Sequence, residues 1–242
     1  MLAWEQAHMD AAVVNAFGFH ALQLGLPQLH ALQANRMAHR WLAVQSVVEQ
    51  DLNVAVALVT DFSALPFPAN SLDLVVLPHT LDLSANPHGV LREVARVLMP
   101  EGRLVITGLN PVSLWGLRQR RSHLYRRFGV EHALVPHAGE WIGYLRLRDW
   151  LNLLNFDIES EHFGCYRPAF LSHALLQRFA WMDAAGERWW PILGSVYMFV
   201  AIRRVRGMTL HTPLWKPAIR LAVATASIAG NASQSSVSGQ ND

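Results

Sequence analysis

Short, continuous apolar runs alternate with amphipathic stretches along this 242-residue chain. Four runs rich in Val, Leu and Ile, each bounded by turn residues, predict strands that are buried on both faces: 20–26, 54–59, 72–77 and 102–109. A further run at 196–205 predicts a late strand. Between the strands, 86–102 and 145–156 carry apolar residues at helical spacing, and Asn86 followed by Pro87 is typical of a helix start. The alternation predicts an α/β fold with a doubly wound, mostly parallel sheet.

The composition indicates how large the core is and where the folded domain ends. Apolar residues make up 52% of the chain, enough to bury a substantial core. We expect one domain over residues 1–224, with insertion or cap elements around 111–145 and 167–192. Residues 225–242 are rich in Ser, Asn, Gly and Gln, and this composition predicts a disordered tail.

Charge, cysteine content and terminal patterns exclude several classes of protein. The formal net charge of +2 does not single out nucleic acid as a partner. Cys165 is the only cysteine, which excludes an internal disulfide and disfavours a thiolate metal site. The start carries Glu5 and Asp10 and lacks the basic segment of a signal peptide, and the late apolar run at 192–202 is too short to cross a bilayer. We therefore expect a cytoplasmic protein without a transmembrane segment.

Residues 59–111 carry the most specific pattern of the chain. An acidic residue, Asp61, follows a strand, and then come "LPFPANSLDLVV", a helix reading "VLREVARVLMPEG" and the strand "RLVITGL". This order resembles the class I S-adenosylmethionine-dependent methyltransferases of the type 11 group. The segments "GLNPVSLWGLR", Trp150–Phe156 and "GCY" at 164–166 are also similar to a smaller bacterial branch of that group. The resemblance implies S-adenosylmethionine as the cofactor and an acceptor that is a small or lipid-like molecule.

The first cofactor motif of the family is altered in this chain. The family has an acid, an apolar residue and then three alternating glycines, whereas this chain reads "QLGLPQL" from Gln23 to Leu29. Only Gly25 remains of the glycines, which allow a close backbone approach to a ligand. Pro27 has no N–H, and Leu29 places a bulky side chain where the last glycine would be. We therefore expect weak or absent cofactor binding.

The resemblance implies roles for three further residues around the cofactor. Gln45, in a compressed second strand at 41–46, replaces the carboxylate that binds the ribose hydroxyls, and its neutral amide makes weaker bonds. Asp61 matches the acid that accepts from the adenine amino group, although an Asp at a strand end also forms turns. Phe62 could flank the adenine or belong to the core.

His79 lies at the end of the strand at 72–77, near the expected position of the methyl group, and is a candidate contact of the cofactor as well as a candidate catalytic residue. Its near-neutral pKa suits a general base, with Asp82 close enough to assist, and the alternative is a histidine without chemistry. Many methyl transfers need only alignment of acceptor, methyl and sulfur. Asn110 and Trp115 follow the next strand and could line an acceptor pocket, or "NPVS" could be a turn that caps a helix.

The first arginine of an arginine-rich segment at 117–128 is Arg118, a further candidate for acceptor binding. It could contact phosphate on RNA, on a nucleotide or on an anionic lipid, but a solvated basic helical face is the commoner explanation of such a segment. Two functions stay open. The leading one is a methyltransferase acting on a small or lipid-like acceptor. The alternative is a catalytically inactive descendant that serves as a binding or scaffold protein, and methylation of RNA is a weaker third.

Overall fold

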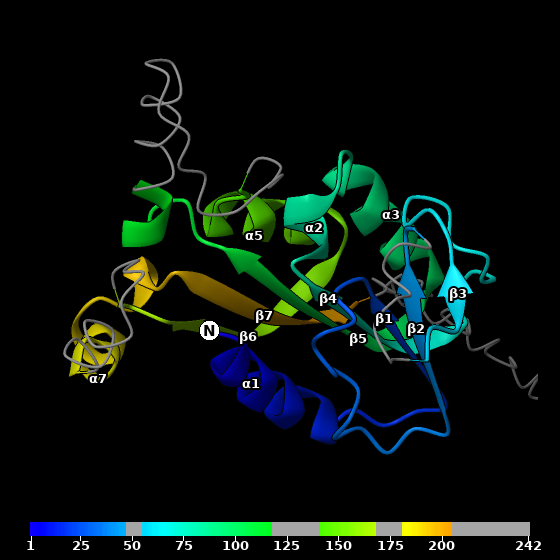
Figure 1. Cartoon of the computed structure of the whole chain (residues 1–242). Coiled ribbons are helices and arrows are strands. Elements are labelled where there is room, and N and C mark those ends of the chain that lie inside the picture. The colour runs from blue at the N-terminus through cyan, green and yellow to red at the C-terminus, as the bar shows by residue number, and fades with distance from the viewer. Residues whose placement is uncertain (47–54, 118–140, 168–180, 205–242) are drawn as a thin grey trace, which may run out of the picture. The chain divides into compact units, whose positions relative to one another are not determined.

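A seven-stranded sheet with the order β3-β2-β1-β4-β5-β7-β6 organises the unit that spans Met1–Arg206 (Figure 1). The computed structural model describes residues 1–46, 55–117, 141–167 and 181–204, all within one compact unit that spans Met1–Arg206. The strands are β1 (His20–Leu24), β2 (His39–Val44), β3 (Leu58–Val59), β4 (Leu72–Pro78), β5 (Leu98–Leu109), β6 (Phe156–Gly164) and β7 (Val196–Arg203). The helices are α1 (Leu2–Val14), α2 (Thr80–Leu83), α3 (Pro87–Val97), α5 (Tyr144–Leu153), α7 (Trp181–Trp189) and the 3-10 turn η2 (Pro191–Leu193).

Strand direction divides the sheet into two parts and defines its functional edge. The five strands from β3 to β5 are parallel, whereas β7 is antiparallel to both of its neighbours. Since β6 is antiparallel to β7, it runs in the same direction as β5. The chain moves outward from β1 to β3 and then returns to β4, so the strand order reverses between β1 and β4. The doubly wound, mostly parallel sheet is thereby confirmed, and ligands of such sheets bind beyond the carboxyl ends of the strands at this reversal.

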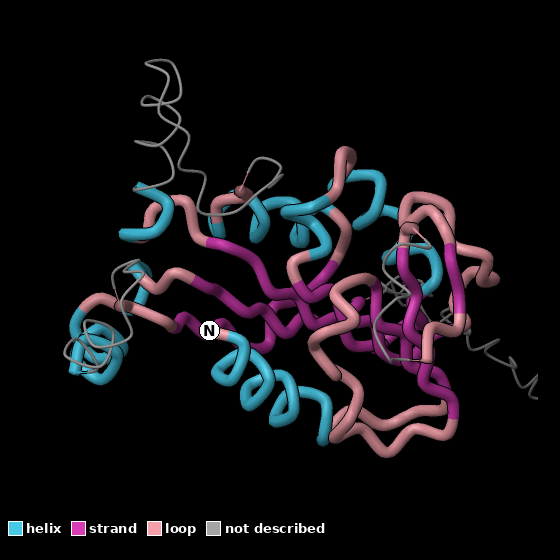
Figure 2. Tube along the Cα trace, in the orientation of Figure 1, coloured by secondary structure: helices cyan, strands magenta, loops and turns pink. Residues whose placement is uncertain are grey.

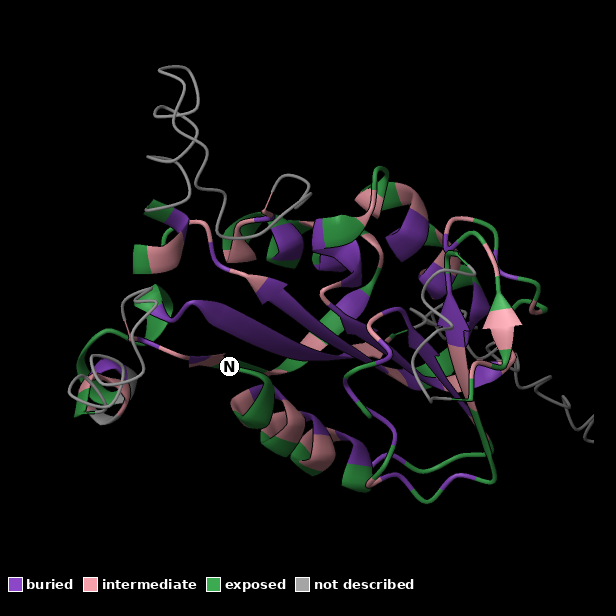
Figure 3. Cartoon of the chain, in the orientation of Figure 1, coloured by how far each residue is buried: buried purple, intermediate pink, exposed green. Residues whose placement is uncertain are grey.

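Two hydrophobic clusters cover the two faces of the sheet. On one face, Met9 and Val13 of α1 are fully buried against alternate residues of β1, β4, β5 and β7. On the other face, α3 and α5 bury their apolar stripes, which include Leu91, Leu147 and Leu151. Figure 1 shows α1 on the opposite side of the sheet from α3 and α5. The inner strands are buried on both faces, as their continuous apolar runs predicted (Figure 3).

The connection from β1 to β2 contains no helix. Residues 25–38 form turns, bends and irregular segments, and Figure 2 draws them as loop. Leu29, Ala31 and Leu32 from this connection pack into the cluster on the α1 face. The N-terminal helix α1 and these turns therefore cover a face that a crossover helix commonly covers in an α/β sheet.

Several predicted boundaries were wrong. The run at 54–59 was expected to be an interior strand, but residues 55–57 lie outside β3, and Val59 is 40% exposed at the sheet edge. The helix expected over 86–102 ends at Val97, and Pro100 lies inside β5, where it follows Leu98, the first residue paired with β4. The "GCY" segment is not a strand beyond Gly164, where β6 ends.

The remaining expectations on organisation stay predictions. Most of the expected cap elements fall on residues 118–140 and 168–180, outside the described residues, as does the tail at 225–242. Within the part of the chain that the structure describes, no helix has the length and apolar character that a membrane span requires.

Candidate functional site

A crevice of about 220 Å³ lies beyond the carboxyl ends of β1, β2 and β4, where the strand order reverses. It is lined by Gly25, Leu26, Pro27, Gln28, Gln45, Phe62, Pro78, Thr80 and Leu83. Three of the residues that the sequence placed around a cofactor, Gly25, Gln45 and Phe62, therefore lie on one cavity. They come from three separate stretches of the chain, and the parallel sheet brings them together.

Gly25 takes a backbone conformation that favours glycine. Its φ is +76°, and its N–H donates to the carbonyl of Ala43 on β2 at 2.7 Å. A Cβ atom at this position would meet the ring of Phe62 at 3.5 Å, an ordinary contact. The left-handed backbone, rather than a lack of space, therefore accounts for glycine here.

The buried side chain of Gln23 holds the loop that follows β1. Its Nε2 donates to the carbonyls of Gly25, Leu26 and Leu29 at 3.2, 3.1 and 2.7 Å, and its Oε1 accepts from the N–H of Ala31 at 3.1 Å. An ionised carboxylate only accepts hydrogen bonds, so it could not replace these donors. Gln23 thus serves the shape of the loop, which the sequence did not reveal.

The two residues that replace glycines have different positions. Pro27 is buried and lines the crevice. Leu29 is 2% exposed and packs into the hydrophobic cluster on the α1 face, so its side chain points away from the crevice. The bulk of Leu29 therefore does not fill the space in which a ligand would bind.

Gln45 and Asp61 are both exposed, but only Gln45 lines the crevice. The Oδ1 atom of Asp61 accepts from the backbone N–H and the hydroxyl of Ser63, both at 2.8 Å. These two hydrogen bonds lower the pKa of the Asp61 carboxyl. The side chain thus forms a turn after β3, and its proposed contact with adenine stays a prediction. Phe62, 4% exposed, belongs to the core and to the crevice wall at once.

His79 turns away from the crevice into a buried ionic cluster that consists of Glu5, His79 and Asp82. Its Nε2 lies 3.1 Å from Oε1 of Glu5 on α1, and its Nδ1 lies 3.4 Å from Oδ2 of Asp82 on α2. The side chains of Glu5 and Asp82 are 0% and 2% exposed. Asp82 also accepts the backbone N–H of Leu109 at 2.8 Å. The cluster therefore joins α1 to the ends of β4 and β5.

The surroundings of His79 decide its charge. Burial lowers the pKa of the imidazole, but the hydrogen bonds and charges of Asp82 and Glu5 outweigh burial and raise the pKa from 6.5 to about 9. A protonated imidazole cannot accept a proton from a substrate. The geometry thus favours His79 as a positively charged link between two carboxylates, and its role as a general base stays a prediction.

Each carboxylate of the ionic cluster has one buried oxygen without a hydrogen-bond partner in the described structure, Oε2 of Glu5 and Oδ1 of Asp82. Sequence reasoning missed Glu5 because a glutamate in the first turn of a helix is normally exposed.

Among the residues that the structure describes, no group of three or more His, Cys, Asp or Glu side chains has an arrangement that could hold a metal ion.

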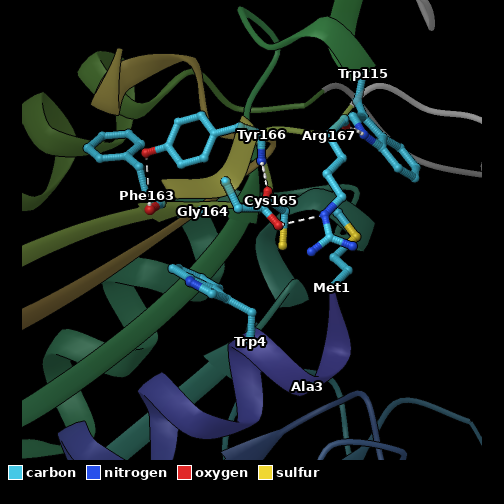
Figure 4. A pocket seen from close by; sticks show the side chains of 10 residues that line it. Met1, Ala3, Trp4, Trp115, Phe163, Gly164, Cys165, Tyr166 and Arg167 are labelled. Atoms are coloured by element: carbon cyan, nitrogen blue, oxygen red, sulfur yellow. Dashed lines mark hydrogen bonds and ion pairs between the residues drawn. The ribbon is translucent and has the colours of Figure 1, made fainter. Parts of the chain in front are cut away.

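A second, larger cavity of about 600 Å³ lies at the carboxyl end of β6 (Figure 4). It is lined by Met1, Ala3, Trp4, Trp115, Phe163, Gly164, Cys165, Tyr166, Arg167 and Asp183. Trp115, a predicted acceptor-binding residue, is one of its walls. Asn110 is fully buried elsewhere: its Nδ2 donates to the carbonyls of Ile192 and Gly194, and its Oδ1 accepts from Val112. Arg118 lies outside the described residues.

Comparison with known proteins decides the family. The profile described as "Methyltransferase domain" matches residues 7–106, from α1 into β5. An uncharacterized protein of Escherichia coli K12, YafS, is 33% identical over 214 residues, which cover 86% of this chain and 79% of YafS. The chain belongs to the class I S-adenosylmethionine-dependent methyltransferases, type 11 group. The demethylmenaquinone methyltransferase of Chlamydia pneumoniae is 34% identical over 84 residues, which cover 35% of this methyltransferase-family chain and 33% of that protein.

Solved structures agree on the fold of this family member. A methyltransferase structure from Archaeoglobus fulgidus aligns over 84% of this chain and 94% of its own, with a TM-score of 0.59 and 15% identity.

The residues of the crevice fit only part of S-adenosylmethionine, the cofactor that the family implies. The positive φ of Gly25, the amide of Gln45 and the ring of Phe62 fit the adenosine part, but no carboxylate lines the crevice among the described residues. Its volume is below the roughly 300–1,000 Å³ of ordinary ligand sites.

Proposed function

We propose that this protein is an S-adenosylmethionine-dependent methyltransferase that binds its cofactor weakly and acts on a small or lipid-like acceptor. One observation carries the proposal: Gly25, Gln45 and Phe62 line one crevice at the strand reversal, and the side chain of Leu29 points away from it. The partial similarity to a demethylmenaquinone methyltransferase supports methyl transfer as the chemistry.

The residues of the crevice would hold the nucleoside rather than react. The backbone of Gly25 allows a close approach of the ligand, the amide of Gln45 would bond the ribose hydroxyls, and Phe62 would flank the adenine. The bound cofactor would supply an electrophilic methyl group on a sulfonium. Alignment of the acceptor with that methyl group can lower the activation free energy by ~7–11 kcal/mol, so the reaction does not require a general base.

A second function, a catalytically inactive binding or scaffold protein, has its own support. The family's two cofactor-binding acids are replaced by Gln23 and Gln45. Gln23 is occupied with three carbonyls of its own loop, so its amide is not available to a ligand. The crevice then offers a nucleoside only neutral partners, whose bonds are weaker than those of carboxylates.

Calorimetric titration with S-adenosylhomocysteine separates the two functions. We expect a dissociation constant of roughly 0.1 mM, which corresponds to about −5.5 kcal/mol. Gln45→Trp and Leu83→Trp place indoles at exposed positions of the crevice and should weaken binding by about tenfold or more. Ser46→Trp, exposed and adjacent but outside the crevice lining, is the matched control. An absence of binding heat at millimolar ligand would favour the inactive protein.

The same titration tests the proposed role of Asp61. If its carboxylate accepts from the adenine amino group, Asp61→Ala should weaken binding of S-adenosylhomocysteine. Ser63→Ala removes one hydrogen bond of the turn but keeps the carboxylate, so it is the control for a merely local change. An unchanged affinity of the Asp61→Ala variant would refute the contact.

A further inference from the structure

The 600 Å³ cavity lies in the other half of the sheet from the cofactor crevice. Its walls come from α1, the segment after β5, the end of β6 and the first turn of α7, represented by Trp4, Trp115, Phe163 and Asp183. Because β5 and β6 run in the same direction, the cavity opens on the same edge of the sheet as the crevice. Its volume is within the range of small-molecule sites.

Four of the ten residues that line the cavity are aromatic, and packing and hydrogen bonds hold three of these side chains in place. A Cβ atom at Gly164 would lie 2.2 Å from the indole of Trp4, so this indole rests directly on the backbone of β6. A Cβ atom at Gly186 would likewise meet the ring of Tyr166 at 2.3 Å. The Nε1 of Trp115 donates to the carbonyl of Arg167 at 2.8 Å. Figure 4 shows these side chains arranged around the cavity.

Tyr166, Arg167 and Asp183 each bond to other groups of the protein. The hydroxyl of Tyr166 donates to the carbonyl of Pro191 at 2.9 Å. The Nε of Arg167 lies 2.6 Å from Oδ2 of Asp183, whose Oδ1 accepts the N–H of Tyr166. Burial raises the pKa of the Cys165 thiol, so this side chain stays neutral and contributes apolar surface. A polar ligand would lose hydration without full compensation here, whereas an aromatic ring would gain contact area and ring–ring interactions.

A short path of contacts connects this cavity to the crevice. Trp4 lines the cavity, and the next residue, Glu5, bonds to His79. The neighbours of His79 in the chain, Pro78 and Thr80, line the crevice. Residues next to the ionic cluster in the chain thus line both cavities.

We propose that the 600 Å³ cavity is the acceptor site and that it takes an uncharged, planar aromatic molecule of one or two fused rings. Only the assignment of this cavity as the acceptor site rests on the proposed function, because binding of such a ring requires no cofactor. Four aromatic side chains, the half-buried neutral thiol of Cys165, and a tyrosine hydroxyl and ion pair that are bonded within the protein select this chemistry over a sugar, a peptide or a free phosphate.

Titration of the full-length protein with 2-naphthol tests the proposal. Ala3 lines the cavity from an exposed position on α1, so Ala3→Trp should fill the cavity and weaken binding by about tenfold or more. Ala11→Trp adds the same side chain to an exposed position of the same helix outside the cavity lining, and its affinity should match the unchanged protein. Circular dichroism of both variants shows whether α1 is retained.

Two further ligands test the chemical class. Decahydro-2-naphthol keeps the fused frame and the hydroxyl but lacks aromaticity, and it should bind about fivefold to tenfold more weakly than 2-naphthol. Cyclohexyltrimethylammonium tests recognition of a cation by the same rings. Equal binding of the saturated alcohol, tighter binding of the cation, or equal affinity of the Ala3→Trp and Ala11→Trp variants for 2-naphthol would each overturn the proposal.

S-Adenosylhomocysteine titrations of the same samples separate this inference from the proposed function. If 2-naphthol binds the unchanged protein but binds the Ala3→Trp variant much more weakly, and S-adenosylhomocysteine binds neither, the aromatic site stands and the methyltransferase function fails. If S-adenosylhomocysteine binds equally to both variants while 2-naphthol binds neither the unchanged protein nor the Ala11→Trp variant, the inference fails and the methyltransferase function stands.

Discussion

At the scale of single residues, His79 combines a strained backbone with a buried charged environment. Its backbone is left-handed, with φ of +52°, and its imidazole lies between two buried carboxylates. Loss of one partner from a buried pair commonly costs about 3–5 kcal/mol because it leaves a charge uncompensated. The cluster of Glu5, His79 and Asp82 is therefore both a link between elements and a source of pH dependence.

The first prediction concerns the stability of the protein above neutral pH. The pKa of His79 is about 9 in the folded protein against 6.5 for the unperturbed group, so its contribution is fully present below pH 6.5 and is lost as the pH rises through 9. A shift of this size corresponds to roughly 3 kcal/mol. Urea unfolding at pH 6.5 and 9.5 measures the decline.

Glu5→Gln is the variant that assigns this pH dependence to His79. It keeps the shape of the side chain but removes one of the two negative charges that raise the pKa. The decline in the free energy of unfolding between pH 6.5 and 9.5 should therefore become smaller. An equally steep decline in both proteins would show that other groups cause it.

A second prediction concerns Gln23. Gln23→Glu would restore the acid of the family motif, but a carboxylate would face the carbonyls of Gly25, Leu26 and Leu29 without a proton to donate. We expect a loss of about 2–3 kcal/mol in the free energy of unfolding. Gln33→Glu makes the same change at an exposed position of the same loop and should have little effect. A stable Gln23→Glu protein with tighter S-adenosylhomocysteine binding would contradict the structural role of Gln23.

At the scale of elements, the sequence predicted best the strands that are buried on both faces. β1, β4, β7 and the second half of β5 are mostly apolar, and the sheet buries them on both faces. α1 and β6 were not predicted. α1 has no clear apolar stripe and buries Glu5 together with Met9 and Val13. β6 contains several charged residues, and most of its positions are exposed or half-buried. Their stability comes from the sheet they pack on or extend, which a local pattern does not show.

The candidate site was predictable where it depends on strand ends. Gly25, Gln45 and Phe62 follow three parallel strands, so the fold alone brings them to one edge. The ionic cluster was not predictable, because it requires a contact between positions 5 and 79 that no motif records. The internal hydrogen bonds of Gln23 were hidden for a related reason: they depend on the shape of a loop without regular structure.

A third prediction concerns the start of α3. Oδ1 of Asn86 accepts the N–H of Gly89 at 2.9 Å and so caps the helix. Asn86→Ala should lower the free energy of unfolding by about 1 kcal/mol, whereas Asn86→Asp retains an acceptor and should lose less. Urea unfolding at pH 7 compares the two. Equal losses for Ala and Asp would mean that the cap hydrogen bond is not what stabilises this end of α3.

At the scale of the whole domain, one sheet separates two hydrophobic clusters. α1 takes part in three features at once: Met9 is buried in the cluster on its face, Glu5 belongs to the ionic cluster, and Trp4 lines the 600 Å³ cavity. α3 buries Leu91 on the opposite face, against the same strands. Because both clusters share β1, β4 and β5, neither helix can leave without exposing a face of the common sheet.

This sharing predicts a single cooperative unfolding transition. Met9→Ala and Leu91→Ala each remove a fully buried side chain, one from each face, and each should cost about 2–5 kcal/mol. Circular dichroism and tryptophan fluorescence should give coincident urea transitions for both variants, with slopes unchanged from those of the natural sequence. If α1 were instead an independently unfolding lid on the acceptor cavity, Met9→Ala would produce an early fluorescence change that Leu91→Ala lacks. That result would replace a rigid acceptor site with one that opens by local unfolding of α1.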